Sequence, residues 1–369
     1  MDIGERLKIA REAIGYNQTE AAQKAGLSSA STICDFETGK REPKFSQLSK
    51  LAEIYHRPVE FFFSKEIQTE SVMLWRSSPK DEKSKKKTEV EFRELCGQYR
   101  KLEILTGELH QEVKLPELDC KDPSQFDFRD AQRLALKTRR EFSLGDIPSD
   151  VLNRVLEEKY FIKIFQIPFD GSAVSTNEEF GPAILLNSNE LTKEWRRNYD
   201  LAHELFHLLT WNIFLKGIQN YVATDHEEKL ANAFASNLLL PEESLKDRLR
   251  QYSNNEGKIT FDNLANIARE FGVSLDALLW RLHYIYNKEK SETTRYIEIA
   301  KNYRKPRQSP AAPSKLPERY CALAERALRE GKLSLLQFAK FMRIPYKKAQ
   351  EYLTEDEDFT DEKISIPVA

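Results

Sequence analysis

The sequence has few cysteines, no long apolar run and almost no net charge. Its 369 residues include four cysteines and no Cys-x-x-Cys pair, which argues against a disulfide framework and against a zinc site built on cysteine. A formal net charge of −2 excludes a protein that coats nucleic acid along its whole length. We find no basic start followed by an apolar stretch, and no apolar run of membrane-spanning length. We therefore expect a cytoplasmic protein that has no membrane partner.

Length and composition predict a multidomain, mainly α-helical chain. A length of 369 residues allows two or three domains. The charged stretch Ser77 to Glu89 and the proline-bearing stretch Pro306 to Ser314 are typical of linkers. The predicted units are an all-helical domain at 1–66, a charged linker with a connecting helix at 67–129, an α+β domain at 130–290, a linker at 291–316, and a small helical unit with an acidic tail at 317–369.

Hydrophobic periodicity predicts the elements of the α+β domain. Five apolar stripes with a helical period and two short apolar runs stand out. The predicted helices are Asp130–Phe142, Pro148–Glu157, Glu194–Asn212, Asp225–Leu240 and Phe261–Tyr284, and the predicted strands are Tyr160–Gln166 and Ala183–Asn187. The connecting helix is expected at Val90–Gly107.

The pentapeptide from His203 to His207, His-Glu-Leu-Phe-His, is the strongest chemical signal in the chain. On a helix, His203 and His207 lie one turn apart on the same face, so both imidazoles can reach one zinc ion. Zinc makes a nearby water more acidic, and Glu204 can take the proton as that water attacks a peptide carbonyl. The alternative is a buried helix whose two histidines merely pack or hydrogen-bond.

The next helix offers a third ligand, because a catalytic zinc normally has three protein ligands and one open position. Residues 225–228 hold four candidate side chains, and helical phase separates them. Glu228 shares a face with Asn232 and two alanines, so this face can approach the histidine helix closely. We therefore expect Glu228 to be the third ligand and Asn232 to hold one of the ligands in place.

The remaining candidates on this helix have other expected roles. Glu227 shares a face with Leu230 and Phe234, which is typical of a core position. Asp225 and His226 either lie near the metal and polarise the carbonyl, or are first-turn side chains, with the carboxylate favoured by the helix dipole.

Three segments together resemble the ImmA/IrrE metallopeptidase family. They are Arg197 to His207, which contains Ala-His-Glu-x-x-His, then Glu228 to Ala235, which contains Ala-Asn-x-Phe-Ala, and finally Leu238 to Pro241. The resemblance covers roughly residues 130–290. The family often has glycine before the second histidine and glutamate before the Ala-Asn pair, where this chain has phenylalanine and leucine.

The resemblance implies roles for four side chains. His203, His207 and Glu228 would hold one Zn²⁺ per chain, and Glu204 would be the general base. Members of this family are similar to enzymes that cut a repressor partner, so a repressor or antitoxin-like protein is the expected substrate. In peptidases of this type the substrate usually adds as a strand at a sheet edge. Ala183 to Leu186 is either that edge or an ordinary core strand.

Residues 18–37 resemble the helix-turn-helix of Cro/XRE repressors, whose second helix enters the major groove. Double-stranded DNA is therefore the expected partner of residues 1–66. Side chains predicted to reach base edges are Ser29, Ser31 and Thr32, and those predicted to reach phosphates are Gln18, Lys40 and Arg41. Acidic neighbours offset the charge of the basic residues, so a monomer would bind DNA weakly. We therefore expect a homodimer, which would bind DNA more tightly. The alternative is a helical domain used for dimerisation or partner binding.

Together the motifs predict a DNA-binding regulator that carries a zinc-dependent endopeptidase. The intact Glu204 favours this interpretation, because a relic of the site would be free to lose it. The alternatives are a non-catalytic regulator or antitoxin-like binding protein with a structural metal site, and a partner-binding sensor gated by its C-terminus. Residues 316–353 resemble another small helix-turn-helix-like unit and are interpreted as a docking element for substrate or partner. Stress response, phage defence and toxin–antitoxin control all stay open as settings.

Overall fold

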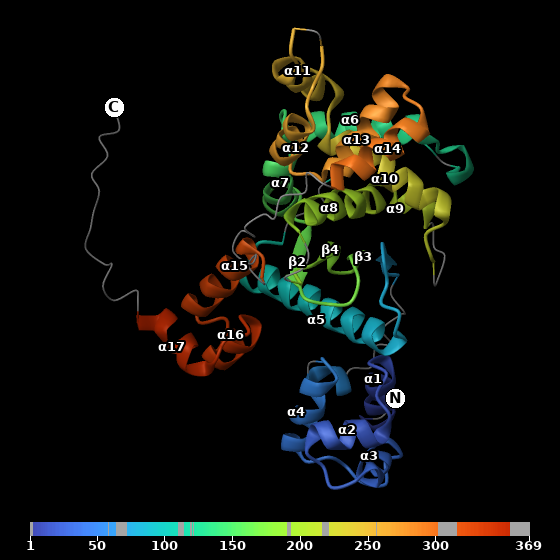
Figure 1. Ribbon diagram of the computed structural model, residues 1–369. Coiled ribbons are helices and arrows are strands. Elements are labelled where there is room, and N and C mark those ends of the chain that lie inside the picture. The colour runs from blue at the N-terminus through green and yellow to red at the C-terminus, as the bar shows by residue number, and fades with distance from the viewer. Residues whose placement is uncertain are drawn as a thin grey trace, which may run out of the picture.

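The chain is mainly helical and holds one small sheet (Figure 1). The computed structural model describes residues 3–57, 59–63, 72–109, 114–118, 120, 122–189, 193–215, 221–255, 257–301 and 316–354. The predicted linker at 306–314 and the acidic tail from residue 355 onward lie outside these residues. In Figure 1 the N-terminal helices lie below the long helix α5, and the sheet lies between α5 and α8.

The N-terminal module consists of short helices that end at tight turns, as predicted. They are α1 (Ile3–Ala13), α2 (Gln18–Ala25), α3 (Ala30–Glu37), α4 (Phe45–Ile54) and the 3₁₀ turn η1 (Val59–Phe62). Asn17 caps α2 by accepting a hydrogen bond from the backbone of Glu20 at 2.9 Å, and Gly26 ends it with a φ of 67°. Phe36 and Tyr55 are buried at the centre of this module.

Helix α5 (Glu82–Thr106) begins eight residues before the predicted Val90. The lysine-rich part of the predicted linker is therefore the start of a helix. Asp81 caps it, because its carboxylate accepts hydrogen bonds from both the backbone and the hydroxyl of Ser84. Lysine and glutamate are themselves good helix formers, so a charged composition does not exclude this structure.

The sheet has four strands in the order β1-β3-β4-β2. These strands are β1 (Leu74–Trp75), β2 (Lys163–Ile167), β3 (Ala173–Glu178) and β4 (Gly181–Asn187). Strand β4 pairs parallel with β2 and antiparallel with β3, and β1 pairs antiparallel with β3. Since β4 lies inside the sheet, the hypothesis that Ala183 to Leu186 forms a free edge for substrate is wrong. It is the ordinary core strand.

The two faces of the sheet pack against different parts of the chain. One face, which includes Ile184 and Leu186, packs under α8 (Glu194–Leu209) together with α6 (Phe128–Glu141) and α10 (Asp225–Leu239). The other face, which includes Phe165 and Leu185, packs against α5 and the C-terminal helices. Those helices are α15 (Glu318–Arg329), α16 (Leu335–Phe341) and α17 (Tyr346–Thr354). The hydrophobic core therefore continues across the boundaries proposed at residues 130 and 290.

The predicted helix Phe261–Tyr284 is two helices, α12 (Phe261–Glu270) and α13 (Leu275–Tyr286). Gly272 separates them with a φ of 61°, and Ser274 starts the second by accepting a hydrogen bond from the backbone of Ala277 at 3.1 Å. The remaining elements are η2 (Pro123–Gln125), η3 (Pro148–Asp150), α7 (Leu152–Glu158), α9 (Trp211–Phe214), α11 (Glu242–Tyr252) and α14 (Lys290–Ala300). Among the described residues, no helix has the length and apolarity to cross a membrane.

Candidate metal centre

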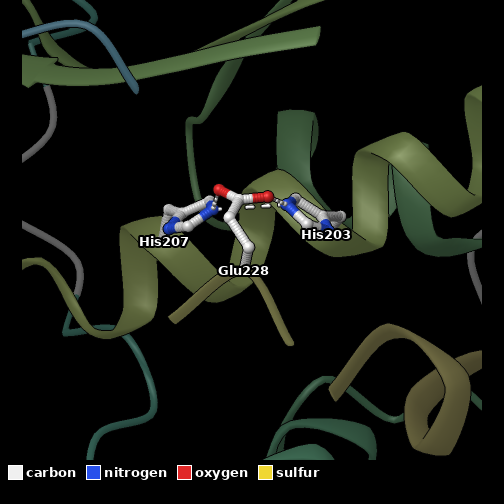
Figure 2. A group of neighbouring side chains, drawn as sticks. All are labelled: His203, His207 and Glu228. Carbon is white, nitrogen blue, oxygen red and sulfur yellow. Dashed lines mark hydrogen bonds and ion pairs between the residues drawn. The ribbon is translucent and has the colours of Figure 1, made fainter. Parts of the chain in front are cut away.

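Helices α8 and α10 bring two imidazoles and one carboxylate to a single point. His203 and His207 lie one turn apart on α8, and both are buried. Glu228, in the first turn of α10, places its carboxylate between them (Figure 2). The Nε2 atoms of the histidines lie 3.3 Å apart, and the Glu228 oxygens lie 3.2 Å from His203 Nε2 and 3.4 Å from His207 Nε2. These three residues form a group that could hold a metal ion.

The outer nitrogen of each imidazole has a partner that fixes the ring. His203 Nδ1 lies 3.2 Å from Asn232 Oδ1, and His207 Nδ1 lies 3.0 Å from Glu227 Oε1. A carbonyl or carboxylate oxygen can only accept, so each Nδ1 is the donor. The two Nε2 atoms then face each other and Glu228. A cation that prefers nitrogen and oxygen ligands, such as zinc, satisfies this donor set.

The surroundings of the two imidazoles shift their pKa values in opposite directions. Burial lowers the pKa of His203 to about 4. Burial opposes the charge on His207 as well, but its hydrogen bonds to Glu227 and Glu228 outweigh burial and raise its pKa to about 10. The pKa of Glu228 falls to about 2, because the contacts to both histidines outweigh burial. One proton therefore rests on His207 facing Glu228, and a bound metal would displace it.

Glu204 is the buried carboxylate beside this group. It follows His203 on α8 and has no accessible surface. Within the described part of the chain, neither of its oxygens has a hydrogen-bond partner. Burial raises its pKa to about 7. A carboxylate with that pKa can accept a proton at neutral pH and return it during the same reaction.

A second buried charge cluster fixes the start of α8. Asp200, three residues before His203, forms an ion pair with Arg76 and accepts a hydrogen bond from the Ser172 hydroxyl at 2.7 Å. Arg196 lies 3.1 Å from the same carboxylate, and the Arg76 guanidinium lies 5.0 Å from the ring centre of Tyr199. This cluster ties α8 to residues near β1, far away in the sequence.

The structure brings together the five predicted residues of this centre, which are His203, Glu204, His207, Glu228 and Asn232. The predicted core position of Glu227 is confirmed, but its contact with His207 was not foreseen from the sequence. Glu227 is fully buried, and its carboxylate contacts His207 and accepts a hydrogen bond from the Tyr221 hydroxyl. An acidic residue on an otherwise apolar face was the available signal. His226 lies outside the centre and packs edge-on against Phe128.

The predicted DNA contacts lie on and around helix α3. Ser29 and Ser31 are exposed at its start, with their hydroxyls 2.8 Å apart, and Thr32 follows. Lys40 is exposed beyond the end of α3, and the Arg41 guanidinium lies 5.7 Å from the ring centre of Phe36. Gln18, at the start of α2, donates a hydrogen bond to Glu37 at 2.9 Å, and its predicted phosphate contact stays a prediction.

Two family models match separate parts of the chain. Residues 157–283 match the IrrE N-terminal-like domain, Peptidase_M78, and residues 7–62 match a helix-turn-helix model. The chain joins a helix-turn-helix domain to an IrrE-like domain. The candidate metal centre therefore lies in a domain of a metallopeptidase-type family. Helix α3 is the second helix of the helix-turn-helix motif.

One curated relative and one solved structure are similar to the chain. The HTH-type transcriptional regulator ImmR of Bacillus subtilis (strain 168) is 33% identical over 66 residues, or 18% of this chain and 51% of ImmR. The chain thus spans about half the length of this relative. The crystal structure of Bacillus thuringiensis PlcR in complex with the peptide PapR7 and DNA aligns over 98% of this chain and 99% of that chain, at 15% identity. The TM-score of this alignment is 0.16.

Proposed function

We propose that the chain is a DNA-binding regulator whose IrrE-like domain is a zinc-dependent endopeptidase acting on a protein partner, a transcriptional repressor or an antitoxin-like protein. The convergence of His203, His207 and Glu228 beside the buried Glu204 carries this proposal. One zinc ion per chain, held by those three side chains, would act as a Lewis acid that polarises the peptide carbonyl and acidifies water.

Glu204 supplies the proton transfers of the proposed reaction. Its carboxylate takes the proton from a water molecule as the water oxygen forms a bond to the peptide carbonyl carbon. The same group then gives that proton to the leaving amine as the carbon–nitrogen bond breaks. A pKa near 7 suits both steps at neutral pH. Asn232 and Glu227 keep the imidazoles oriented, so the ligand set needs no rearrangement.

A second candidate is a transcriptional regulator that uses the metal only for structure. The similarity of the N-terminal part to ImmR, a transcriptional regulator, favours this alternative. The two candidates differ in what they require of Glu204. A structural site needs the three ligands alone, whereas a peptidase also needs the carboxylate beside them.

The test begins with metal content measured by mass spectrometry on the wild type, His203→Ala and Glu204→Gln. We expect about one zinc per chain in the wild type and in Glu204→Gln, and none in His203→Ala. Loading with manganese instead of zinc identifies the preferred ion. Absence of stoichiometric metal after reloading with zinc would overturn the peptidase proposal.

The second stage measures cleavage of candidate repressors and antitoxin-like proteins, purified and incubated with each metal-loaded form. The wild type should yield defined fragments, and Glu204→Gln should slow their appearance by roughly a hundredfold or more, in line with the loss of a general base. Equal behaviour of the wild type and Glu204→Gln would favour the purely regulatory alternative. Generic substrates such as casein are unsuitable, since a latent protease would leave them intact.

A further inference from the structure

Residues 72–77, called the strap here, lie along the outer edge of β3 (Figure 1). Leu74 and Trp75 pair antiparallel with Ser175 and Val174. The Arg76 amide donates to the carbonyl of Ala173 at 3.2 Å. At the other end of the strap, the Thr176 hydroxyl donates to the carbonyl of Val72 at 2.9 Å. The strap therefore uses the hydrogen-bonding groups that any strand added at this edge would use.

Alternate side chains of the strap point to opposite faces of the sheet, as in any strand. Leu74 is buried in the core cluster under α8, and Arg76 reaches Asp200 on that helix. Trp75 points the other way, where its indole donates to Glu89 at 2.8 Å and packs edge-on against Phe169. Leu74 and Arg76 thus face the helix that carries the metal ligands.

The position of the strap relative to α8 matters because α8 packs directly against β3 and β4. The outer edge of β3 is therefore the edge of the sheet beside the metal-binding helix. Ser175, which pairs with Leu74, belongs to the strand that packs against α8. An extended peptide added here would run along α8, the helix that carries Glu204 and two of the three proposed ligands.

We infer that the outer edge of β3 is the peptide-binding site of the proposed peptidase, and that the strap occupies it in the manner of a substrate. Cleavage of the bound peptide rests on the proposed function, whereas its binding at β3 does not. The strap also indicates the substrate class, an extended segment with an apolar residue followed two positions later by a basic residue. The apolar side chain takes the place of Leu74, and the basic side chain takes the place of Arg76 against Asp200.

The charge cluster around Asp200 is the reason to expect a basic residue at the second position of the substrate pattern. Asp200 is buried, and removal of the strap would leave it facing Arg196, whose side chain is 41% exposed. A buried carboxylate that loses a partner is strongly destabilised, so the vacated site favours a replacement cation. Arginine suits it best because a guanidinium can make two parallel hydrogen bonds to a carboxylate.

The backbone pairing of the strap is short, so a peptide that replaces the contacts of Leu74 and Arg76 can exchange with it. The ladder of the strap with β3 is only two residues long, and most of its residues keep some exposure to solvent. Short pairings with exposed hydrogen bonds open at far lower free energy than the whole fold.

A reversible lock tests the inference. Trp75 and Val174 are opposed residues that point away from α8, so the pair Trp75→Cys and Val174→Cys can form a disulfide that fixes the strap without entering the peptide site. The test uses the full chain in the Glu204→Gln background, loaded with zinc. The probe is a fluorescein-labelled peptide with the sequence of residues 72–78, and fluorescence anisotropy reports its binding.

We expect the reduced double-cysteine chain to bind the peptide, and the oxidised chain to bind it at least tenfold more weakly. A probe with glutamate in place of its arginine should bind the reduced chain at least tenfold more weakly than the original probe. The single variant Trp75→Ala, which loosens the strap from the far side, should bind more tightly than the chain with Trp75 intact.

Equal binding by the oxidised and reduced forms, equal binding of the two probes, or no binding by the reduced form would each overturn the inference. Zinc content is measured on the same samples, which separates the two proposals. A chain that holds zinc but takes no peptide loses only the strap inference. A chain that takes the peptide but holds no zinc loses the peptidase proposal and keeps the peptide site.

Discussion

Glu227 holds His207 in place, with its Oε1 atom 3.0 Å from the Nδ1 atom of that histidine. Its other oxygen accepts a hydrogen bond from the hydroxyl of Tyr221, a residue in the loop before α10. The Nε2 atom of His207, which faces Glu228, is therefore oriented by two side chains, Glu227 and Tyr221, neither of which is a candidate ligand.

Removing this support should weaken zinc binding without abolishing it. Glu227→Gln keeps an oxygen that can accept from Nδ1 but loses the charge, so we expect zinc affinity to fall about 10- to 100-fold. Competition with a coloured chelator measures the change. Glu243→Gln, which alters an exposed carboxylate on α11, serves as the matched control and should leave affinity unchanged. Unaltered affinity in Glu227→Ala would rule out this role.

The ion pair between Asp200 and Arg76 should matter for stability. Asp200→Asn leaves the Arg76 guanidinium facing a neutral amide in a buried site, and breaking such a pair costs about 3–5 kcal/mol. Urea unfolding of the zinc-loaded chain measures the loss. Asp247→Asn removes a partner of the exposed pair with Arg250, and its cost should stay below about 1 kcal/mol. Equal costs for the two variants would contradict the argument.

Glu157 should make the stability of the fold depend on pH. Its Oε1 atom accepts a hydrogen bond from the backbone amide of Arg319 at 3.0 Å, and burial raises its pKa to about 7 from its usual 4.5. The folded chain therefore keeps this proton over a pH range in which the unfolded chain has released it. The stabilisation from this group is present in full below pH 4.5 and is lost as the pH rises to 7.

The variant Glu157→Gln keeps an acceptor for the Arg319 amide and cannot ionise. It should be more stable than the wild type at pH 8, by up to about 3 kcal/mol, and the difference should shrink towards zero at pH 4 to 5. Thermal unfolding of both proteins across this range gives the comparison. A difference in melting temperature that did not vary with pH would show that ionisation of Glu157 is not its cause.

DNA binding should depend on the basic residues beyond α3. Lys40→Glu combined with Arg41→Glu should weaken binding to double-stranded DNA and flatten its salt dependence by about two units of slope, if both side chains meet phosphates. Mobility shift at several salt concentrations measures both effects. Lys347→Glu with Lys348→Glu makes the same charge change on α17 and is the control. Equal weakening by the two pairs would indicate a charge effect without a local contact.

The helical parts of this fold could be predicted from sequence because their signals are local. Asn17 and Gly26 mark the ends of α2, and the heptad-like spacing of apolar residues marks α8 and α10. The metal group followed from the same logic, since one turn separates His203 from His207 and helical phase selects Glu228. Each of these inferences needs only residues that are neighbours in the sequence.

The missed parts are those that depend on distant contacts. Strand β3 shows little alternation because its first four residues are all buried, and the two residues of β1 are too few to show any period. The bond between Arg76 and Asp200 joins residues 124 positions apart, which no local pattern predicts. Glu227 is buried as its apolar face of α10 predicts, but its contact with His207 was missed because that histidine lies on another helix.

The span that matches the IrrE-like family, residues 157–283, does not contain the whole core of the fold, so it is not expected to be inherited as a separate folding unit. This span contains β2, β3 and β4. Helix α5, which covers the second face of the sheet, precedes the span, and α15, α16 and α17, which pack with α5, follow it. A gene fragment limited to that span would leave the second face of the sheet without the helices that bury it. A recombination event that preserves the fold would have to carry residues 72 to 354 together. The helix-turn-helix module at residues 3–63 contacts α5 through Glu20 with Lys83 and through His56 with Glu94, so a replacement module would have to supply similar partners.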